Sequence, residues 1–393
     1  MIKKSILFII IITMISCNTR TVAPDYFGQP LPNATPVIFA KGTISKKGRF
    51  EHGISFTPDI GELTFGVLDH RGLSGKIYYT KKVNDIWTTP EIFVPLENEN
   101  VFLPYFTPNG TSLLYAQRIS DLENSYITDI WSLKKVNGDW NSPKKMQSPI
   151  NSESREANAS MTNDGTIYFS SNRNCEGKEK CYTADLFYSK LVDNTYKKAQ
   201  PISQVNSSND EESIFISPKE DYIIFCRYSN NESFVDLHIS YRDKNNIWTI
   251  PQILDDSINS KDWDRRPFVS MDNKFLFFTR LEIGEKGLTE SDIYWVNTSK
   301  VFKPFVYNQI NDITLNLGEQ FETPIPTDYF KDIDGAELTI SIDQNAHNWL
   351  DFDNKNMKLS GLPTVAGKFK LAFTAMDALS NITKDTIQIT VNN

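Results

Sequence analysis

The sequence contains little cysteine or histidine, with four residues of each among 393. The four histidines, His52, His70, His238 and His347, are scattered, and none stands at a His-x-x-x-His spacing, so a structural zinc site is not expected. Lysine and arginine total 41 against 49 aspartate and glutamate, which gives a formal net charge of −8. No run of basic residues offers a surface that could follow a phosphate backbone, so the sequence argues against a nucleic-acid partner.

Several catalytic fingerprints are also missing. The chain has no Gly-x-Ser-x-Gly nucleophile elbow, no phosphate-binding loop and no Gly-rich dinucleotide motif. Each of these motifs places backbone or side-chain groups where a reaction needs them, so their absence removes the common serine hydrolases and nucleotide-dependent enzymes from consideration.

What the sequence does contain is a unit repeated five times between residues 50 and 305. It is clearest from Glu156 to Ile202, where Asn163-Asp164-Gly165 separates two apolar runs and predicts a hairpin turn. The corresponding turns recur at intervals of 50, 55, 55 and 53 residues. The turns are anchored by Pro58, Pro108, Asn163, Pro218 and Met271. About four short strands per unit at this period predict a β-propeller.

The motifs within the unit are specific. The second strand ends in apolar triplets such as Ile167-Tyr168-Phe169, and the third begins with triplets such as Asp185-Leu186-Phe187. The turn appears as Phe56-Thr57-Pro58-Asp59 and as Ile216-Ser217-Pro218-Lys219. Together these motifs resemble the TolB-type, WD-repeat-like β-propeller repeat. The resemblance implies an all-β, five-bladed propeller over residues 34–305, but propellers serve many unrelated functions.

A partial copy of the repeated unit precedes the first full repeat. Residues 35–39, Thr-Pro-Val-Ile-Phe, copy the outer-strand motif at residues 89–93, Thr-Pro-Glu-Ile-Phe. A ring needs its ends joined, so we expect residues 35–40 to supply the outer strand of the last blade and remove an exposed edge. A sixth, degenerate blade is the alternative, but no remaining stretch is long enough for it.

Residues 1–17 have the pattern of a signal peptide, with Lys3 and Lys4 before an apolar stretch. The segment from Met14 to Cys17 resembles the bacterial lipoprotein lipobox, although the family prefers Leu where this chain has Met14. The resemblance implies lipidation of Cys17 and a tether over residues 18–33. It also implies that a lipid anchor attaches the protein to the cell envelope at the outer membrane, on either its periplasmic or its surface face. An ordinary secretory signal with an incidental cysteine is the alternative.

A column of charged residues precedes the innermost strand of the unit. It consists of Glu51, Glu156, Glu211 and Asp264, with Arg155, Arg265 and Arg266 beside it. Propeller ligands usually meet the ring at the channel mouth, where carboxylates could serve acid–base chemistry or bind a cation or a sugar. The alternative is a solvated charged rim.

A second charged column joins the end of the second strand to the start of the third. Its pairs are Arg118 with Asp129, Arg173 with Asp185, Arg227 with Asp236, and Arg280 with Asp292. Because neighbouring antiparallel strands bring these ends together, we expect an ion pair within each blade. A ring of anion-binding arginines is the alternative.

Three cysteines remain beyond Cys17. Cys175 and Cys181 flank a short charged loop, and in an exported protein such a local pair is expected to form a disulfide. Cys226 lies within an apolar strand and is expected to be a buried free thiol.

From residue 306 to residue 393 the period stops and a different domain begins. Its motifs, among them Asp328 to Gly335, Trp349 to Asp353 and Leu359 to Pro363, resemble in order the Ig-like, dystroglycan-type cadherin-like domain of bacterial surface proteins. The resemblance implies a β-sandwich.

The same domain carries a candidate calcium site. Asp332 and Asp334 stand before Gly335 in one turn, and Asp377 occupies a position where the cadherin-like family carries an acidic residue. Oxygen ligands clustered in this way suit calcium. The alternative is that the aspartates accept hydrogen bonds from turn amides.

These features predict a non-catalytic envelope lipoprotein that uses its propeller to bind a protein or a glycan. A carbohydrate-active propeller enzyme, a lyase or hydrolase working at the channel mouth, is the alternative. Convergence of the acidic column on one pocket would favour the enzyme.

Overall fold

The computed structural model describes residues 26–119, 127–175, 183–229, 234–343 and 347–393. Strands dominate the described residues, and the helices among them are three short 3-10 turns. These are η1 (Val94–Leu96), η2 (Arg173–Cys175) and η3 (Thr298–Lys300). No helix among these residues is long and apolar enough to cross a membrane.

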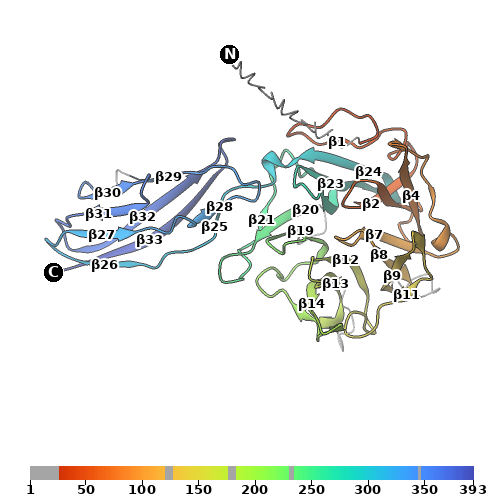
Figure 1. Cartoon of the computed structure of the whole chain (residues 1–393), viewed down its shortest axis with the longest axis horizontal. Helices are drawn as coiled ribbons and strands as arrows, with labels where there is room; N and C mark the ends of the chain where they lie inside the picture. Colours follow the sequence, from red (N-terminus) through yellow and green to blue (C-terminus); the bar gives the residue numbers. More distant parts are fainter. Residues whose placement is uncertain (1–25, 120–126, 176–182, 230–233, 344–346) are drawn as a thin grey trace, which may run out of the picture.

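Within residues 26–305 the described strands form five groups of four, each antiparallel inside the group (Figure 1). The innermost strands are β2 (Phe50–Phe56), β7 (Val101–Phe106), β12 (Glu156–Met161), β18 (Glu211–Ile216) and β22 (Trp263–Val269). The second strands are β3 (Glu62–Leu68), β8 (Ser112–Arg118), β13 (Ile167–Ser171), β19 (Tyr222–Tyr228) and β23 (Phe275–Gly284). The third strands are β4 (Gly75–Val83), β9 (Thr128–Val136), β14 (Asp185–Ser189), β20 (Val235–Tyr241) and β24 (Gly287–Asn297). The outer strands are β6 (Glu91–Ile92), β11 (Lys144–Lys145), β17 (Gln200–Pro201), β21 (Gln252–Ile253) and β1 (Val37–Ile38).

The groups close into a ring. Each innermost strand contacts the innermost strand of the next group, and β22 of the last group contacts β2 of the first. This arrangement is a β-propeller, in which the sheets stand around a central channel. Further short strands extend the outer hairpins: β5 (Ile86–Trp87), β10 (Asp139–Trp140), β15 (Leu191–Val192) and β16 (Thr195–Tyr196).

The predicted turn anchors lie between the first and second strands of their groups. In the second group the Thr107 hydroxyl donates to Asn109 Oδ1 at 2.8 Å. Gly110 follows with φ 68°, and a Cβ added there would lie 3.0 Å from Pro58 of the preceding group. Glycine is required at this point because the backbone is left-handed and the neighbouring turn is close.

The N-terminal strand completes the last group, as the repeated Thr-Pro-x-Ile-Phe motif predicts. Val37 pairs with Trp295 and Ile38 with Tyr294, and the amide of Phe39 donates to the carbonyl of Ile293 at 2.7 Å. The Phe39 ring is fully buried against Trp295, at a centroid distance of 5.2 Å. The last sheet is therefore built from both ends of the repeat region.

Every innermost strand carries a β-bulge at its third or fourth residue. The register against the second strand shifts there in all five groups. The residues at the bulge have positive φ angles between 56° and 64°, and they are Gly53, Leu103, Asn158, Ser213 and Arg266. A bulge turns an extra side chain out of the pleat. All five of these residues line the small cavity at the ring centre.

The C-terminal domain consists of two sheets around one apolar core. One sheet has the order β26 (Ile313–Asn316), β33 (Ile382–Asn392), β32 (Gly367–Met376) and β29 (Thr339–Ile342). The other has the order β27 (Phe321–Pro324), β31 (Lys358–Gly361) and β30 (Leu350–Asp353). Alternation along β32 and β33 places residues such as Leu371, Phe373 and Ile389 in the core.

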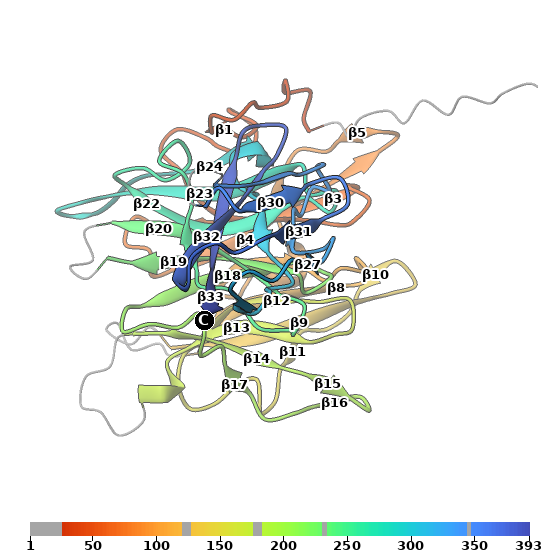
Figure 2. The same cartoon turned by 90° about the vertical axis from the view of Figure 1, so that its left-hand side faces the viewer.

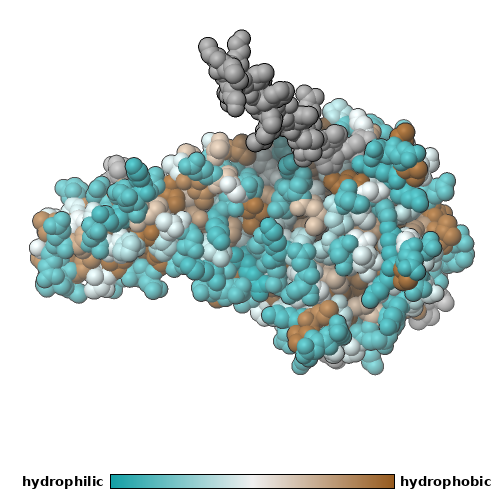
Figure 3. Space-filling view, in the orientation of Figure 1, coloured by the Kyte–Doolittle hydropathy of each residue, from teal (hydrophilic) through white to brown (hydrophobic). Residues whose placement is uncertain are grey.

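The two domains meet at a packed junction, where β25 (Phe305–Val306) pairs with β28 (Phe330–Lys331). The ring of Phe305 stacks on Tyr241 of the propeller at 4.4 Å. On the other side, the Asn381 amide donates to the Ser299 carbonyl at 3.0 Å. Figure 2 shows the C-terminal domain in front of the propeller. The face in Figure 3 is mainly hydrophilic, with scattered apolar side chains.

Candidate functional site

The four carboxylates of the acidic column are fully buried, and each pairs with one arginine. The pairs are Glu51 with Arg49 (2.5 Å), Glu156 with Arg173 (3.2 Å), Glu211 with Arg227 (2.7 Å) and Asp264 with Arg280 (2.8 Å). None of these carboxylates lines the central cavity defined by the described residues. The convergence on one pocket that would favour an enzyme is therefore not seen at this cavity, because each carboxylate is held by an arginine 2 to 17 residues away in the sequence.

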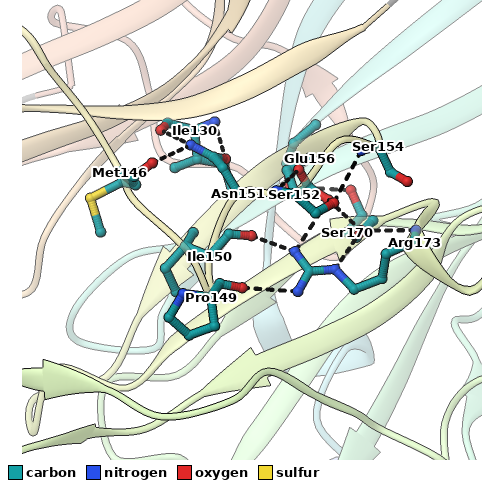
Figure 4. Close-up of polar contacts among 12 residues, drawn as sticks. Ile130, Met146, Pro149, Ile150, Asn151, Ser152, Ser154, Glu156, Ser170 and Arg173 are labelled. Atoms are coloured by element: carbon teal, nitrogen blue, oxygen red, sulfur yellow. Dashed lines mark hydrogen bonds and ion pairs between the residues drawn. The ribbon is translucent and has the colours of Figure 1, made fainter.

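The third group shows how this arrangement is built (Figure 4). Glu156 accepts from the Ser152 amide at 2.8 Å and from the Ser152 hydroxyl at 2.7 Å. Arg173 pairs with the same carboxylate and donates to the Pro149 carbonyl at 2.9 Å. Asn151, beside Ser152, accepts from the Ile130 amide at 2.8 Å and so connects the loop to the preceding group. The carboxylate thus fastens the loop, the innermost strand and the neighbouring sheet.

The connection repeats in the next two groups, where Asn206 and Asn259 accept from the amides of Leu186 and Leu237, each at 2.8 Å. Its sequence signature is Asn-Ser-x-x-x-Glu or Asn-Ser-x-x-x-Asp, which the sequence analysis did not identify. The periodic spacing of this motif is the signal that could have revealed it.

The arginine partners differ from the sequence prediction. Arg227 and Asp236 stand opposite each other in the β19–β20 register, and Arg280 and Asp292 do so in β23–β24. The guanidinium groups nevertheless bind the carboxylates of the innermost strands. A fully buried carboxylate has lost its water and gains most from a charged partner, whereas Asp236 and Asp292 keep some exposure. The predicted pairs of Arg173 with Asp185, Arg227 with Asp236 and Arg280 with Asp292 are corrected accordingly. Asp129, the fourth predicted aspartate, pairs with Lys145 at 2.6 Å.

The structure does bring the three predicted arginines together, around a glutamate that the sequence analysis passed over. Arg155 Nη1 bonds to Glu212 Oε1, Arg265 Nη2 lies 2.7 Å from Glu212 Oε2, and Arg266 Nη1 lies 3.6 Å from the same oxygen. These residues come from three consecutive groups of the ring. We call Arg155, Glu212, Arg265 and Arg266 the arginine cluster.

Arg266 extends the cluster into the ring centre. Its Nε donates to His52 Nε2 at 2.9 Å, and its Nη1 bonds to Asn158 Oδ1 and Ser213 Oγ. Arg266, Asn158 and Ser213 line a central cavity of about 40 Å³, enough for about three water molecules. Because His52 Nε2 accepts a hydrogen bond, the neutral ring carries its proton on Nδ1.

Burial and the arginines together set the charge states. Burial alone would raise the pKa of Glu212, but Arg155, Arg265 and Arg266 outweigh it and hold that pKa well below its usual range. Burial and the nearby charge of Glu212 raise the pKa of Asp210 to about 7. Burial and then Arg266 lower the pKa of His52 well below its ordinary value, so this ring is neutral at pH 7.

Two aromatic rings border the cluster. The Arg265 guanidinium lies 5.3 Å from the centre of the Tyr228 ring and 5.5 Å from that of Trp263. The two rings meet edge to face at 5.3 Å. Trp263 is half-buried and is the first residue of β22, so it lies at the end of this innermost strand that follows the preceding loop.

The remaining sequence predictions have different outcomes. The signal peptide, Cys17 and residues 18–25 of the tether lie outside the described residues. The predicted Cys175–Cys181 disulfide also lies outside them, because Cys181 and the side chain of Cys175 are not described. Cys226 is a buried free thiol, as predicted, with its sulfur 3.3 Å from Ser213 Oγ.

The predicted calcium ligands bind their own turns. Asp377 Oδ1 accepts from the amides of Leu379 and Asn381, each at 2.8 Å. Asp334 Oδ1 accepts from the Ala336 amide at 2.9 Å. In the described part of the chain, no group of three or more His, Cys, Asp or Glu side chains is placed to hold a metal ion. The calcium site that includes Asp332 is therefore not supported by this arrangement.

Comparison with known families supports the C-terminal assignment. The family described as "Putative Ig domain" matches residues 303–392, so this part of the chain is an Ig-like domain. A comparison with curated proteins found no match.

Solved structures resemble the chain in fold. A glycoside hydrolase has 10% identity and a TM-score of 0.44, over 72% of this chain and 94% of that one. The catalytic domain of the Coprinopsis cinerea GH62 α-L-arabinofuranosidase has 8% identity and a TM-score of 0.43, over 67% and 98%. A Bacteroides fragilis protein titled a putative alpha-galactosidase has 21% identity and a TM-score of 0.19, over 23% of this chain and only 18% of its own length. The first two are similarities to β-propeller glycoside hydrolases, and the third covers only a small part of this chain. None of them carries an argument about the ligand of this chain.

Proposed function

We propose that this protein is a non-catalytic envelope lipoprotein whose propeller binds a glycan at the mouth of its central channel. The observation that supports the proposal is the setting of Arg265, which lies against the rings of Tyr228 and Trp263 and beside the Glu212 carboxylate. Ligand sites combine aromatic surface with a few fixed polar groups. The half-buried Trp263 ring, which packs edge to face on the buried Tyr228, can pack against the C–H face of a sugar ring, while the guanidinium and carboxylate bind hydroxyl groups.

The rest of the proposed architecture serves this site. The five groups of strands are the blades of a five-bladed propeller over residues 34–305, and the Ig-like domain is a β-sandwich over residues 306–393. Lipidation of Cys17 and the tether over residues 18–33 would hold both domains at the outer membrane. Junction contacts such as the Lys244–Asp328 pair, at 3.2 Å, would fix their relative placement.

The absence of catalysis in this proposal rests on the acidic column. Each of its four carboxylates forms an ion pair with an arginine: Glu51, Glu156, Glu211 and Asp264. Carboxylates held in this way fasten the ring, and they have no access to a substrate in the channel.

A glycan-binding experiment tests the proposal. Trp263→Ala is expected to abolish or strongly weaken binding to glycans that the parent protein retains on a glycan array, because the aromatic surface is lost. Trp140→Ala is the matched control, since Trp140 lies on the outer hairpin of the second group and packs against Phe106. Thermal melting checks that both variants are folded. The proposal fails if the folded parent retains no glycan, or if both variants bind as the parent does.

A carbohydrate-active enzyme is the second candidate function, and Asp210 is the observation that favours it. Asp210 directly precedes β18 and Glu212 is the second residue of that strand; the charges of Arg155 and Arg265 act on both carboxyl groups. The raised pKa of Asp210, about 7, and the depressed pKa of Glu212 leave one carboxyl group partly protonated beside one that is ionised. Such a separation is the pattern of acid–base catalysis by paired carboxyl groups.

Release of reducing ends or unsaturated products from a bound glycan separates the two functions. If the protein is an enzyme, the parent turns the glycan over, and Asp210→Asn abolishes this turnover but keeps the binding. Binding without turnover supports the non-catalytic protein.

A further inference from the structure

We propose that the propeller rests on the lipid bilayer with one face of its ring, and that the apolar tips of its outer hairpins enter the headgroup layer. The proposal rests on the lipid anchor of the proposed function, and it adds the orientation in which that anchor holds the protein. The arginine cluster then lies on the face that points away from the membrane.

The outer hairpins of four groups lie on one side of the ring, which we call the hairpin face. They span residues 83–86, 136–139, 192–195 and 243–247. Three of them begin beside the turn that joins the first two strands of their own group. The amides that show this are those of Lys82, Lys135 and Arg242, which donate to the carbonyls of Gly61, Thr111 and Asp221, each at 2.8 Å. Figure 2 shows β5, β10, β15 and β16 together on this side, at the right. The arginine cluster stands at the other ends of the innermost strands, where β12, β18 and β22 begin.

Aliphatic side chains recur at the tips of these hairpins. In sequence order they are Val83, Ile86, Val136, Val192 and Ile247, with exposed fractions of 48%, 72%, 51%, 41% and 49%. A single exposed aliphatic residue is ordinary on a protein surface, but the propeller core does not require the same choice on four hairpins of one face. The rest of this face is mainly hydrophilic (Figure 3), so the tips form separate points of contact rather than one continuous patch.

A tryptophan ring and a basic side chain lie behind three of the tips. The charged ends of Lys82, Lys135 and Arg242 lie 5.0, 4.9 and 5.2 Å from the ring centres of Trp87, Trp140 and Trp248. Tryptophan is enriched at the level of lipid headgroups, and long basic side chains keep their charge in water while their stems cover apolar surface. An aliphatic tip in front of such a pair suits the boundary between the headgroups and the acyl chains.

The chain enters the propeller at the same face. The Tyr26 ring is buried and lies 5.7 Å from Phe56, the last residue of β2, and 5.5 Å from Phe275, the first residue of β23. Both of these residues stand at the ends of their strands that meet the hairpin face. Phe27 stacks on Trp87 of the first outer hairpin at 4.6 Å. The N-terminal segment is therefore fixed next to the hairpin tips.

The length of chain before Tyr26 limits how the ring can face the bilayer. Cys17 precedes Tyr26 by nine residues, so their Cα atoms are at most about 32 Å apart even in a fully extended chain. A seven-residue strand such as β3 spans about 23 Å. Placing the opposite face on the bilayer would use most of this reach merely to pass the edge of the ring. A lipid on Cys17 therefore holds the hairpin face nearest to the membrane.

Charge does not single out this face. The exposed lysines of the hairpins stand among exposed aspartates, and Lys135 and Arg242 pair with Glu62 and Glu220. The exposed residues are Lys81, Lys134, Lys190 and Lys197 on one side of the balance and Asp85, Asp139 and Asp193 on the other. The contact with lipid is therefore apolar, and added salt should change it little.

Hydrogen exchange tests the orientation. The parent protein, held by its own anchor in phosphatidylcholine vesicles, is compared with residues 18–393 free in solution, a chain that keeps every described residue. Amide exchange at residues 83–86, 136–139 and 192–195 is expected to be at least about threefold slower on the vesicles. Exchange at residues 97–100, 206–210 and 259–262, which precede innermost strands on the opposite face, should not change.

A triple variant and a matched control identify the side chains responsible. Replacing Ile86, Val136 and Ile247 together with serine should remove the slowing. The control replaces Ile119, Phe234 and Ile283 with serine, because these residues are 49%, 43% and 47% exposed and lie on the opposite side of the ring. The control should keep the slowing, and both variants should melt close to the parent because the replaced side chains are exposed.

Slowing at the opposite face, equal exchange at both faces, or slowing that survives in the triple variant overturns the proposal. If the parent carries no lipid, the anchor fails separately, and partition of residues 18–393 into the same vesicles decides. Partition that the triple variant weakens about tenfold, that the control keeps and that high salt leaves unchanged supports the hairpin face. No partition, or equal partition of the two variants, overturns it. Glycan binding is measured apart from all of these results.

Discussion

Replacing Phe39 with alanine should destabilise the propeller strongly, because this side chain attaches the N-terminal strand to the last sheet. Phe39 is fully buried and lies 5.1 Å from the ring of Phe277 and 5.2 Å from that of Trp295. Removing a buried phenylalanine ring costs about 3–5 kcal/mol. For a domain of this size the corresponding drop in melting temperature is on the order of 10 °C.

The matched control is Val37→Ala in the same strand. Val37 pairs with Trp295 through its backbone, but its side chain is 40% exposed, so its loss should change stability by about 0.5 kcal/mol or less. Calorimetric melting or urea unfolding of both variants and the parent measures the difference. If Phe39→Ala melts within a degree or two of Val37→Ala, the N-terminal strand does not close the ring in solution and the reasoning is refuted.

Three further predictions concern the anchor and the buried pairs. Cys17→Ala should abolish incorporation of labelled lipid and release the protein from membrane fractions; a variant that stays labelled and membrane-bound contradicts the lipobox assignment. Arg227→Met should cost about 3–5 kcal/mol in urea unfolding, because it leaves the Glu211 carboxylate buried without its partner; a loss below about 1 kcal/mol would show that the pair is not structural. Burial, opposed by Arg49, raises the pKa of Glu51 to about 7, above its usual 4.5. The contribution of protonated Glu51 to the free energy of unfolding is therefore full below pH 4.5 and is lost as the pH rises through 7. Between pH 4 and pH 8 the parent should therefore lose stability relative to Glu51→Gln, and an equal difference between the two proteins at both pH values counts against this pKa.

The sequence determined the repeat and its closure. The turn motifs are local, since a turn residue such as Gly110 is selected by the backbone conformation at its own position. The pairing of β1 with β24 could be predicted because one blade copies the outer-strand motif of another. The Ig-like domain was also recognisable, because its motifs keep a fixed order over residues 306–393.

The site was determined only by the tertiary structure. Arg155, Glu212 and Arg266 come from three groups of strands, and no local pattern specifies which side chains a closed ring brings together. The bulges decide which residues face the axis, and only Gly53 among the five bulge residues lacks the steric cost of a positive φ. For the same reason the acidic column was misplaced: Glu211 and Glu212 are adjacent in sequence, but the alternation of the strand sends one into a buried pair and the other into the arginine cluster.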